Sequence, residues 1–290
     1  MKKKICFIVN PISGVGRQKV IEKMIDRHLN RTLFEYEVVY TKAAKHATEL
    51  AKQAAADNFN IVTAVGGDGS VNETARGLIG TNTAMAVIPT GSGNGLARHL
   101  NIPLELEKAM DVINNANETR IDTIQFNNET FVNLAGVGFD AHVGWEFAKF
   151  GKRGLSSYLK VIIREFPKYK AQNFELIIDG KILNKKAFLI SFANGSQWGN
   201  NAYIAPLADI ADGYIDIAVL KDFSLLHIIP IAFRLFGKTL HQSSHLEFIK
   251  TKEVIVKQGG GIAHIDGEPI EIGNTISIKV NPLSLKVIVP

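Results

Sequence analysis

The chain has 290 residues, of which 46% are hydrophobic and 21% are charged. This length predicts two domains or one large domain, and the composition excludes both a disordered chain and a polytopic membrane protein. Lys and Arg number 33 against 28 Asp and Glu, and this net charge of +5 matters only if it is concentrated on one surface that meets an anion.

The start of the chain and its cysteine content indicate a cytoplasmic protein. The apolar run at residues 5–9 stops at Asn10 and Pro11, so it is too short for an export signal. Cys6 is the single cysteine and cannot form an intramolecular disulfide, which fits a reducing compartment. We expect Cys6 to be a small core residue.

The first part of the chain alternates between predicted strands and helices. Such alternation indicates a mainly parallel sheet that helices cover on both faces. The predicted strands are residues 4–9, 36–40, 61–65 and 84–88, and the helices that alternate with them are residues 43–56, 70–79, 96–100 and 104–114, with a further helical pattern at residues 20–29.

After about Asp122 the pattern changes to closely spaced strands with turn signals such as Asp179-Gly180, which predicts a mostly antiparallel second domain. The strands are expected at residues 130–134, 174–178, 187–193, 214–220, 253–256, 275–280 and 286–289, and helices at residues 148–165 and 224–236. Because residues 224–236 are apolar on most faces, we expect a core helix there, with a lipid-facing wall as the alternative.

Three glycine-rich loops follow predicted parallel strands, at the edge where an open α/β sheet binds its ligands. Glycines let backbone N–H groups approach phosphate oxygens closely, so phosphate is the expected guest. Neither a P-loop nor the dinucleotide fingerprint fits, since Ala232 stands five residues before Gly237-Lys238-Thr239 and the required third glycine is absent from the strand loops. The loops are residues 10–14, 66–73 and 89–95.

Asp68 is the unusual residue of the second loop. A carboxylate beside a phosphate site is repulsive unless a divalent cation lies between them, so Asp68 indicates Mg²⁺ or a role in proton transfer. The alternative is an aspartate that caps the next helix.

These loops and several later motifs resemble the diacylglycerol kinase catalytic-domain family, which is part of a superfamily with the bacterial lipid kinases, sphingosine kinases and ceramide kinases. The resemblance covers essentially the whole chain. It implies an N-terminal Rossmann-like α/β domain with a parallel sheet, residues 1–124 rejoined by residues 284–290, and a C-terminal antiparallel β-sandwich domain, residues 125–283. The motifs are residues 66–73, 89–97, 133–141, 205–216 and 266–269.

The resemblance implies a kinase that uses ATP as phosphate donor and Mg²⁺ as cofactor, and transfers the γ-phosphate to a lipid hydroxyl. It assigns Glu268 as the base and Asp68 to the Mg²⁺ and phosphate side. It also implies a structural Mg²⁺ held by Asp209, Asp212 and Tyr214. The nucleotide-binding positions that it implies are Asn10, Pro11, Ile12, Ser13, Gly14, Thr41, Gly66, Gly67, Asp68, Gly69, Ser70, Val71, Asn72 and Ser92.

A basic amphipathic segment at residues 146–170 carries seven Lys or Arg against two Glu, a local surplus of +5. It predicts peripheral contact with an anionic membrane at the inner face. The alternative is a helix with solvated basic flanks, and no motif supports nucleic-acid binding.

Diacylglycerol is the first expected substrate, and sphingoid bases, ceramide or another lipid are alternatives. An NAD kinase-like enzyme and a non-catalytic, nucleotide-regulated membrane-binding module are more distant hypotheses. A homodimer is left open.

Overall fold

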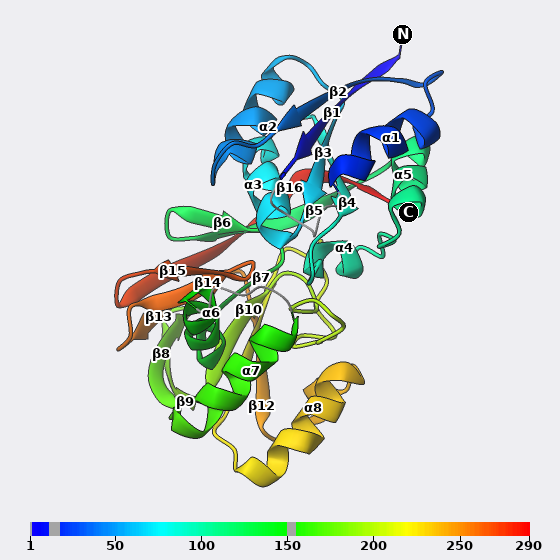
Figure 1. The fold of residues 1–290 in the computed structure, drawn as a ribbon. Helices are drawn as coiled ribbons and strands as arrows, with labels where there is room; N and C mark the ends of the chain where they lie inside the picture. Colours follow the sequence, from blue (N-terminus) through cyan, green and yellow to red (C-terminus); the bar gives the residue numbers. More distant parts are fainter. Residues whose placement is uncertain (1, 12–17, 150–154) are drawn as a thin grey trace. The chain divides into compact units, whose positions relative to one another are not determined.

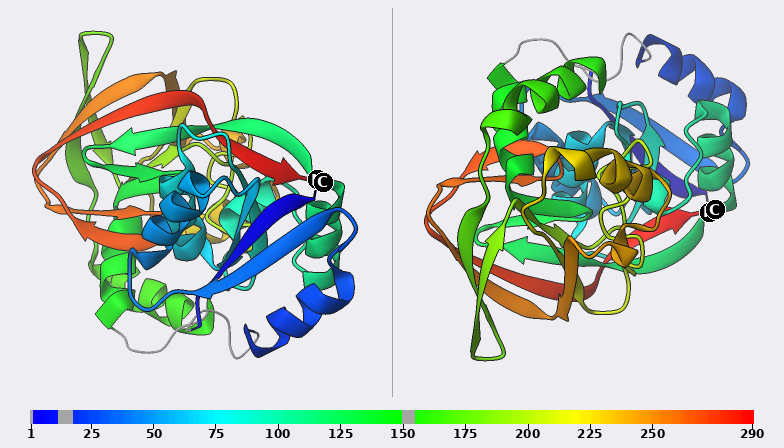
Figure 2. Two further views of the ribbon diagram at one scale, coloured as in Figure 1. Left: turned by 90° about the horizontal axis from the view of Figure 1, so that it is seen from above. Right: turned by 90° about the horizontal axis from the view of Figure 1, so that it is seen from below.

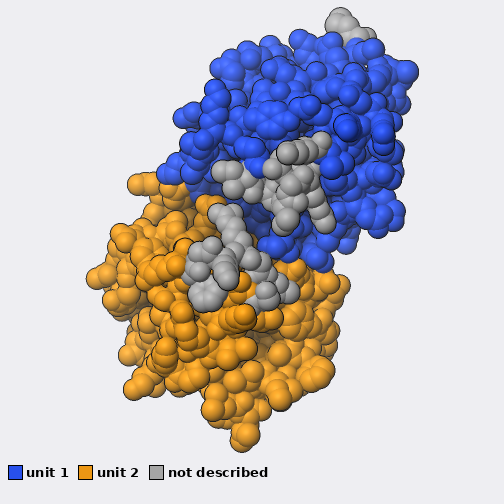
Figure 3. All heavy atoms as spheres, in the orientation of Figure 1, with its two compact units in different colours: residues 1–123, 282–290 blue, residues 124–281 orange. Residues whose placement is uncertain are grey.

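The computed structural model describes residues 2–11, 18–149 and 155–290 (Figure 1). It divides into two compact units, shown in different colours in Figure 3. Unit 1 comprises Met1–Thr123 and Pro282–Pro290, and unit 2 comprises Ile124–Asn281.

Unit 1 contains a sheet in which neighbouring strands run parallel, in the order β2, β1, β3, β4, β16. The C-terminal strand β16 joins this sheet beside β4, since Val287 of β16 lies opposite Met85 of β4, and β5 also pairs with β16. The strands are β1 (Lys3–Val9), β2 (Phe34–Tyr40), β3 (Ile61–Gly66), β4 (Ala84–Pro89) and the end of β16 (Thr275–Val289).

Helices cover both faces of this sheet (Figures 1 and 2). Alternate residues of β1, such as Ile5 and Phe7, join one apolar core with Ile21 and Ile25 of α1 and with Met110 of α5. The opposite face is covered by α2 and α3. The helices of unit 1 are α1 (Gln18–His28), α2 (His46–Ala56), α3 (Asp68–Leu78), α4 (Gly95–His99) and α5 (Leu106–Asn115).

Unit 2 is built mainly from antiparallel strands. One sheet has the order β12, β11, β10, β7, β14, β15, and the facing layer pairs β16 with β13, β13 with β8, and β8 with β9. The strands are β5 (Asn117–Phe126), which begins in unit 1, β6 (Glu129–Phe131), β7 (Leu134–Gly138), β8 (Gln172–Ile178), β9 (Lys181–Ala187), β10 (Leu189–Ala193), β11 (Ile215–Leu220), β12 (Leu246–Thr251), β13 (Glu253–Gln258), β14 (Ile262–Ile265) and β15 (Glu268–Glu271).

The core of unit 2 lies between these two layers. Val137 of β7 and Phe192 of β10 meet Leu176 of β8, Val256 of β13 and Ile278 of β16 in one buried cluster. This is a β-sandwich, so the predicted fold class, an α/β domain followed by an antiparallel β-sandwich domain, is confirmed.

In the described residues of unit 2, three helices and three short 3₁₀ turns accompany the strands. Of the helix predicted at residues 148–165, α7 contains residues 155–165, residues 148–149 belong to the end of α6, which begins at Phe139, and residues 150–154 lie outside the described residues. The helices are α6 (Phe139–Lys149), α7 (Leu155–Glu165) and α8 (Ile228–Phe236), and the turns are η1 (Phe166–Lys168), η2 (Leu225–His227) and η3 (Leu240–Gln242).

The prediction of a core helix at residues 224–236 is wrong. No residue of α8 is buried, although Ile231 and Leu235 pack against the apolar cluster on the outer face of the β7–β10–β11 sheet. Apolar composition alone does not separate a core helix from a surface helix with a bare apolar face.

None of the helices in the described part of the chain is both long and apolar enough to cross a bilayer.

Candidate functional site

In unit 1 the predicted nucleotide residues gather at the carboxyl ends of the parallel strands. Asn10 follows β1, Thr41 follows β2, and Gly67 follows β3. Because parallel strands end at the same edge of a sheet, these loops are neighbours. Pro11 is described and half-buried, whereas the predicted positions Ile12, Ser13 and Gly14 lie outside the described residues.

Direct hydrogen bonds connect the first loop to its neighbours. The side-chain amide of Asn10 donates to Ser70 Oγ at 3.1 Å. The backbone N–H of Thr41 donates to the carbonyl of Val9 at 3.0 Å. Residues that lie 60 positions apart in the sequence therefore meet at one edge of the sheet.

The second and third loops touch through glycine backbones. A Cβ atom placed on Gly91 would lie 2.5 Å from the Cα of Gly67 and 2.8 Å from Asn94 Oδ1. The N–H of Thr90 donates to the carbonyl of Gly66 at 2.9 Å beside this contact. Only glycine at position 91 allows the loops to approach this closely.

Asp68, the first residue of α3, holds the third loop in place. One carboxylate oxygen accepts the N–H of Asn94 at 2.9 Å, and the other accepts the N–H of Gly95 at 2.6 Å. Asp68 thus caps α4, the short helix of the third loop, while Asn94 adopts a left-handed backbone with φ of 52°. This role differs from the alternative that the sequence suggests, in which Asp68 caps its own helix, α3.

The remaining nucleotide-binding candidates differ in exposure. Ser92 is exposed and Gly69 and Ser70 are half-buried, so these positions can be reached from solvent. Val71 and Asn72 are buried within α3, where they support the shape of the loop. A phosphate group would therefore meet a rim of glycine and serine positions followed by the N-terminus of α3, which favours anions.

In unit 2, Glu268 stands at the end of a tight hairpin. Asp266 and Gly267 have φ angles of 46° and 85°, so they form the two-residue turn between β14 and β15, and Glu268 is exposed opposite Ile265. The carboxylate of Asp266 is buried and accepts three backbone N–H groups, those of Val132 and Asn133 at 3.1 Å and that of Leu134 at 2.8 Å. These bonds fix the hairpin that carries Glu268.

A second buried polar pair lies behind the same hairpin. His264 Nε2 is 3.0 Å from Asp140 Oδ2, and both side chains are only 7% exposed. Gly136 makes room for the pair, since a Cβ there would collide with Asp140 and lie 2.7 Å from His264 Nε2. Burial raises the pKa values of Tyr158 and Tyr169, and the negative charge of Asp140 adds to the rise.

The predicted structural metal ligands Asp209, Asp212 and Tyr214 lie in one loop of unit 2. Asp209 accepts the N–H of Ala211, and Asp212 accepts the N–H of Tyr214 at 2.9 Å. The second oxygen of Asp212 is 2.5 Å from the ammonium of Lys250. Among residues 2–11, 18–149 and 155–290, no three His, Cys, Asp or Glu side chains form a group that could hold a metal ion.

Asp216 of β11 and Lys250 of β12 are paired residues on strands beside this loop. Burial raises the pKa of Asp216, and the Lys250 ammonium at 3.7 Å partly opposes that rise. The hydrogen bond to Asp212 raises the pKa of Lys250. Carboxylate oxygens suit Mg²⁺, but Lys250 already neutralises Asp212, so this loop fits Mg²⁺ only if the lysine moves away.

The basic segment at residues 146–170 is partly neutralised within itself. Lys149 pairs with Glu146 at 2.9 Å, Arg164 pairs with both Glu146 and Glu165, and Lys168 lies 3.6 Å from Glu165. Lys152 and Arg153 fall outside the described residues. Lys160 and Ile163 of α7 are exposed.

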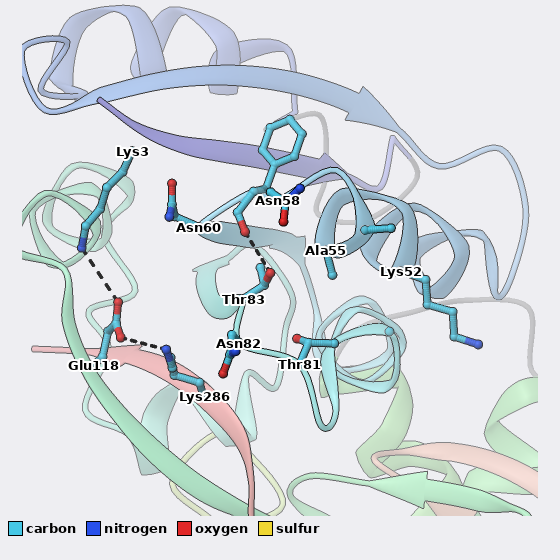
Figure 4. Close-up of a pocket in the computed structure, with 13 residues that line it drawn as sticks. Lys3, Lys52, Ala55, Asn58, Asn60, Thr81, Asn82, Thr83, Glu118 and Lys286 are labelled. Atoms are coloured by element: carbon cyan, nitrogen blue, oxygen red, sulfur yellow. Dashed lines mark hydrogen bonds and ion pairs between the residues drawn. The ribbon is translucent and has the colours of Figure 1, made fainter. Parts of the chain in front are cut away.

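A pocket of about 640 Å³ in unit 1 lies at the opposite edge of the sheet (Figure 4). It is lined by Asn60 and Thr83, which precede β3 and β4, and by Lys3 and Lys286, whose ammonium groups lie 3.9 and 3.3 Å from Glu118. Because the glycine loops leave the other ends of these strands, this pocket lies away from the predicted nucleotide-binding residues.

Two family models together match nearly the whole chain. Residues 4–126 match the diacylglycerol kinase catalytic domain, and residues 133–289 match the YegS C-terminal NAD kinase beta sandwich-like domain. The chain belongs to the diacylglycerol kinase catalytic-domain family. This membership makes it an enzyme of the lipid kinase class, as predicted.

Relatives of this lipid kinase cover most of its length. A diacylglycerol kinase of Bacillus subtilis (strain 168) is 29% identical over 280 residues, 92% of this chain and 90% of the relative. A diacylglycerol kinase of Staphylococcus aureus is 28% identical over 243 residues, 81% of this chain and 76% of the relative. A crystal structure of a diacylglycerol kinase from Bacillus anthracis matches with a TM-score of 0.77 at 20% identity, covering 99% of this chain and 97% of that chain, which shows a shared fold.

Several residues that organise the loops of this kinase are not predicted by sequence patterns. Asn94 and Gly91 lie within the motif at residues 89–97, which is a usable signal, but the sequence alone predicts no role for them. Asp140 also lies in a motif. Its partner His264 and the counterion Lys250 carry no sequence signal, because their contacts form only when strands that are distant in the sequence pair with each other.

Proposed function

We propose that this lipid kinase transfers the γ-phosphate of ATP to the hydroxyl group of a membrane lipid, and that the lipid is diacylglycerol. One observation supports the nucleotide part above all others: Asp68, Gly67 and Gly91 join two glycine loops at the carboxyl edge of the unit 1 sheet. The names of the Bacillus and Staphylococcus relatives support the choice of lipid.

The residue roles that we propose follow from this arrangement. The phosphates and the nucleotide are bound by Asn10, Thr41, residues 66–72 and Ser92. Residues 11–14 continue the first loop and take part in the same binding. Phosphoryl transfer depends on positioning and charge neutralisation more than on covalent chemistry, and backbone N–H groups with an α-helix N-terminus supply both. Asp68 is the carboxylate on the phosphate side, where Mg²⁺ would neutralise it.

Glu268 is the proposed base for the lipid hydroxyl. Its exposure leaves the carboxylate accessible to a substrate, and the buried Asp266 fixes its hairpin. Asp209, Asp212 and Tyr214 are the proposed structural Mg²⁺ ligands, a role that requires Lys250 to leave Asp212. We place the enzyme in the cytoplasm, in peripheral contact with the membrane.

A transfer assay with γ-labelled ATP and a total lipid extract tests this proposal. Wild type should place the label in phosphatidic acid, Asp68→Ala and Glu268→Gln should lose most of the transfer, and chelation of Mg²⁺ should abolish it. Label in a phosphorylated sphingoid base or ceramide would change the substrate and keep the reaction class. Label in NAD or a sugar phosphate in the aqueous phase would overturn the lipid kinase assignment for this chain.

Comparison of Glu268→Gln with Asp68→Ala distinguishes the roles of these two carboxylates. If this variant keeps wild-type transfer while Asp68→Ala loses it, Glu268 is not the base. A thermal unfolding measurement on each variant controls for simple loss of the fold.

A further inference from the structure

The surface of unit 2 carries an uncovered apolar patch on η2 and α8. We call it the α8 surface and define it as Leu225, Leu226, Ile229, Phe233 and Phe236. Leu226 is 86% exposed, Phe233 76% and Ile229 67%. Large apolar side chains in water at this density mark a contact surface rather than ordinary surface variation.

The helix has two apolar stripes, and only one of them is covered. Ile231 and Leu235 pack on the apolar cluster of unit 2, and the carbonyl of Leu235 accepts the N–H of Tyr203 at 3.0 Å. Leu226, Ile229, Phe233 and Phe236 follow the spacing i, i+3, i+7, i+10 and point outward. A surface helix in water normally carries polar residues on that face, so α8 is anchored on one side and ready to contact an apolar partner on the other.

The charges near the α8 surface favour one of its two possible partners, a lipid surface, over the other, a second copy of the chain. Residues 223–246 contain no Asp or Glu, and they include Arg234 and Lys238. Two copies that met through this surface would bring like charges together. Anionic lipid headgroups would instead attract them.

The length of the helix fits a position in the membrane interface. Nine residues at a rise of 1.5 Å span about 14 Å, less than half of the roughly 30 Å hydrocarbon core of a bilayer. A short helix that is anchored on one side can lie in the plane of the interface with its outward apolar side chains below the headgroups.

We propose that the α8 surface inserts into a membrane that contains anionic lipids and docks the enzyme on the bilayer that holds its substrate. The inference rests on the proposed lipid kinase function only for the biological purpose of the membrane contact. The binding of the α8 surface to a membrane does not depend on that function. It differs from the electrostatic contact predicted for residues 146–170, because insertion needs the apolar side chains of α8. Lys149, Arg164 and Lys168 of that segment already have carboxylate partners.

Vesicle sedimentation with the full chain tests the insertion. The test variant is Leu226→Ser with Phe233→Ser, and the matched control is Ile182→Ser with Ile255→Ser, two exposed apolar residues on β9 and β13 of the same unit. On phosphatidylcholine vesicles with phosphatidylglycerol, the test variant should bind at least about tenfold more weakly than wild type, and the control should bind like wild type. Since all four residues are exposed, both variants should unfold at the wild-type temperature.

A second variant reports the depth of α8 directly. Phe233→Trp should show a blue-shifted tryptophan emission on vesicles relative to the wild-type spectrum, and lipids brominated on their acyl chains should quench it. Wild-type-like vesicle binding by the double variant, or an unshifted and unquenched tryptophan, would overturn the inference. So would self-association of wild type that the double variant abolishes while both bind vesicles equally.

An activity measurement distinguishes this inference from the proposed function. With a water-soluble short-chain diacylglycerol the double variant should match wild type, whereas with long-chain diacylglycerol in vesicles it should lose activity in proportion to its lost binding. If wild type phosphorylates neither lipid, the proposed substrate is wrong, and the vesicle and quenching measurements still decide whether α8 inserts.

Discussion

At the scale of single residues, the edge of the sheet that carries the glycine loops depends on two positions without side chains. Gly67 and Gly91 have no side chains, so their backbones come close enough for Asp68 to reach the N–H groups of Asn94 and Gly95. The carboxylate then ties the start of α3 to the start of α4. The close approach and the hydrogen bonds therefore support each other.

Gly91→Ala tests this dependence. The new Cβ would meet the Gly67 backbone at 2.5 Å, and because backbone cannot rotate away, we expect a loss of about 2 kcal/mol in the free energy of unfolding and weaker ATP binding. Chemical denaturation and nucleotide titration measure the two effects.

The matched control is Gly144→Ala in α6. A Cβ at Gly144 would meet no atom within 4 Å, and alanine is a better helix former, so this variant should gain about 0.5–1 kcal/mol and bind ATP like wild type. Equal stability of the two variants would show that the glycine contact is not tight.

At the scale of elements, the β14–β15 hairpin is fixed by one buried carboxylate. Asp266→Ala removes the acceptor for three buried backbone N–H groups and leaves alanine in a left-handed conformation. We expect a loss of about 3 kcal/mol or more in the free energy of unfolding. Denaturant unfolding measures it.

The chain contains a close control for this substitution. Asp179 occupies the same first position of an Asp-Gly turn between β8 and β9, with φ of 50°, but it is exposed. Asp179→Ala should therefore cost only the backbone penalty, about 1–2 kcal/mol. If both variants lose equal stability, the buried bonds of Asp266 do not anchor the hairpin.

The ion pair between Asp212, in the loop of residues 209–214, and Lys250 of β12 leads to a prediction about how pH and Mg²⁺ affect stability. Lys250→Met removes the ammonium beside Asp212 and Asp216, and we expect a loss of about 1 kcal/mol near neutral pH, where the carboxylates are ionised. Because burial raises the pKa of Asp216, its ionisation opposes folding as the pH rises through that pKa, so the loss should shrink on acidification.

Mg²⁺ should restore stability to Lys250→Met more than it stabilises wild type, since the metal can then take the place of the lysine. Lys252→Met, which removes a lysine over the Tyr214 ring, is the control and should respond to Mg²⁺ like wild type. An identical Mg²⁺ response in all three proteins would argue against the proposed ligands Asp209, Asp212 and Tyr214.

Periodicity and motif spacing predicted the strands and glycine loops of unit 1 well, because buried parallel strands are continuous apolar runs that end in turn residues. They failed at α8, where the same apolar pattern lies on the surface. They also missed the Asp140–His264 and Asp212–Lys250 pairs, since those contacts depend on pairings between distant strands that local sequence does not encode.

At the scale of the whole molecule, unit 1 is assembled from both ends of the chain. Leu285, Val287 and Ile288 of β16 are buried, and Val287 pairs with Met85 of β4. The N–H of Leu283 donates to Asp122 Oδ1 at 2.7 Å, and the carbonyl of Ser284 accepts the N–H of Gly80 at 2.9 Å. The glycine loops therefore extend from a sheet that includes residues 284–289 of β16.

Deletion of residues 282–290 tests this organisation in full. It leaves every proposed nucleotide-binding residue in the chain but exposes the edge of β4 and uncovers its apolar neighbours. We expect rapid proteolysis within residues 1–123 and loss of ATP binding, while deletion of Pro290 alone changes neither. Limited proteolysis with fragment mass analysis and an ATP titration measure the outcome. If the truncated chain binds ATP as wild type does, β16 is dispensable for the nucleotide edge, and the loops of unit 1 are held by β1 to β4 alone.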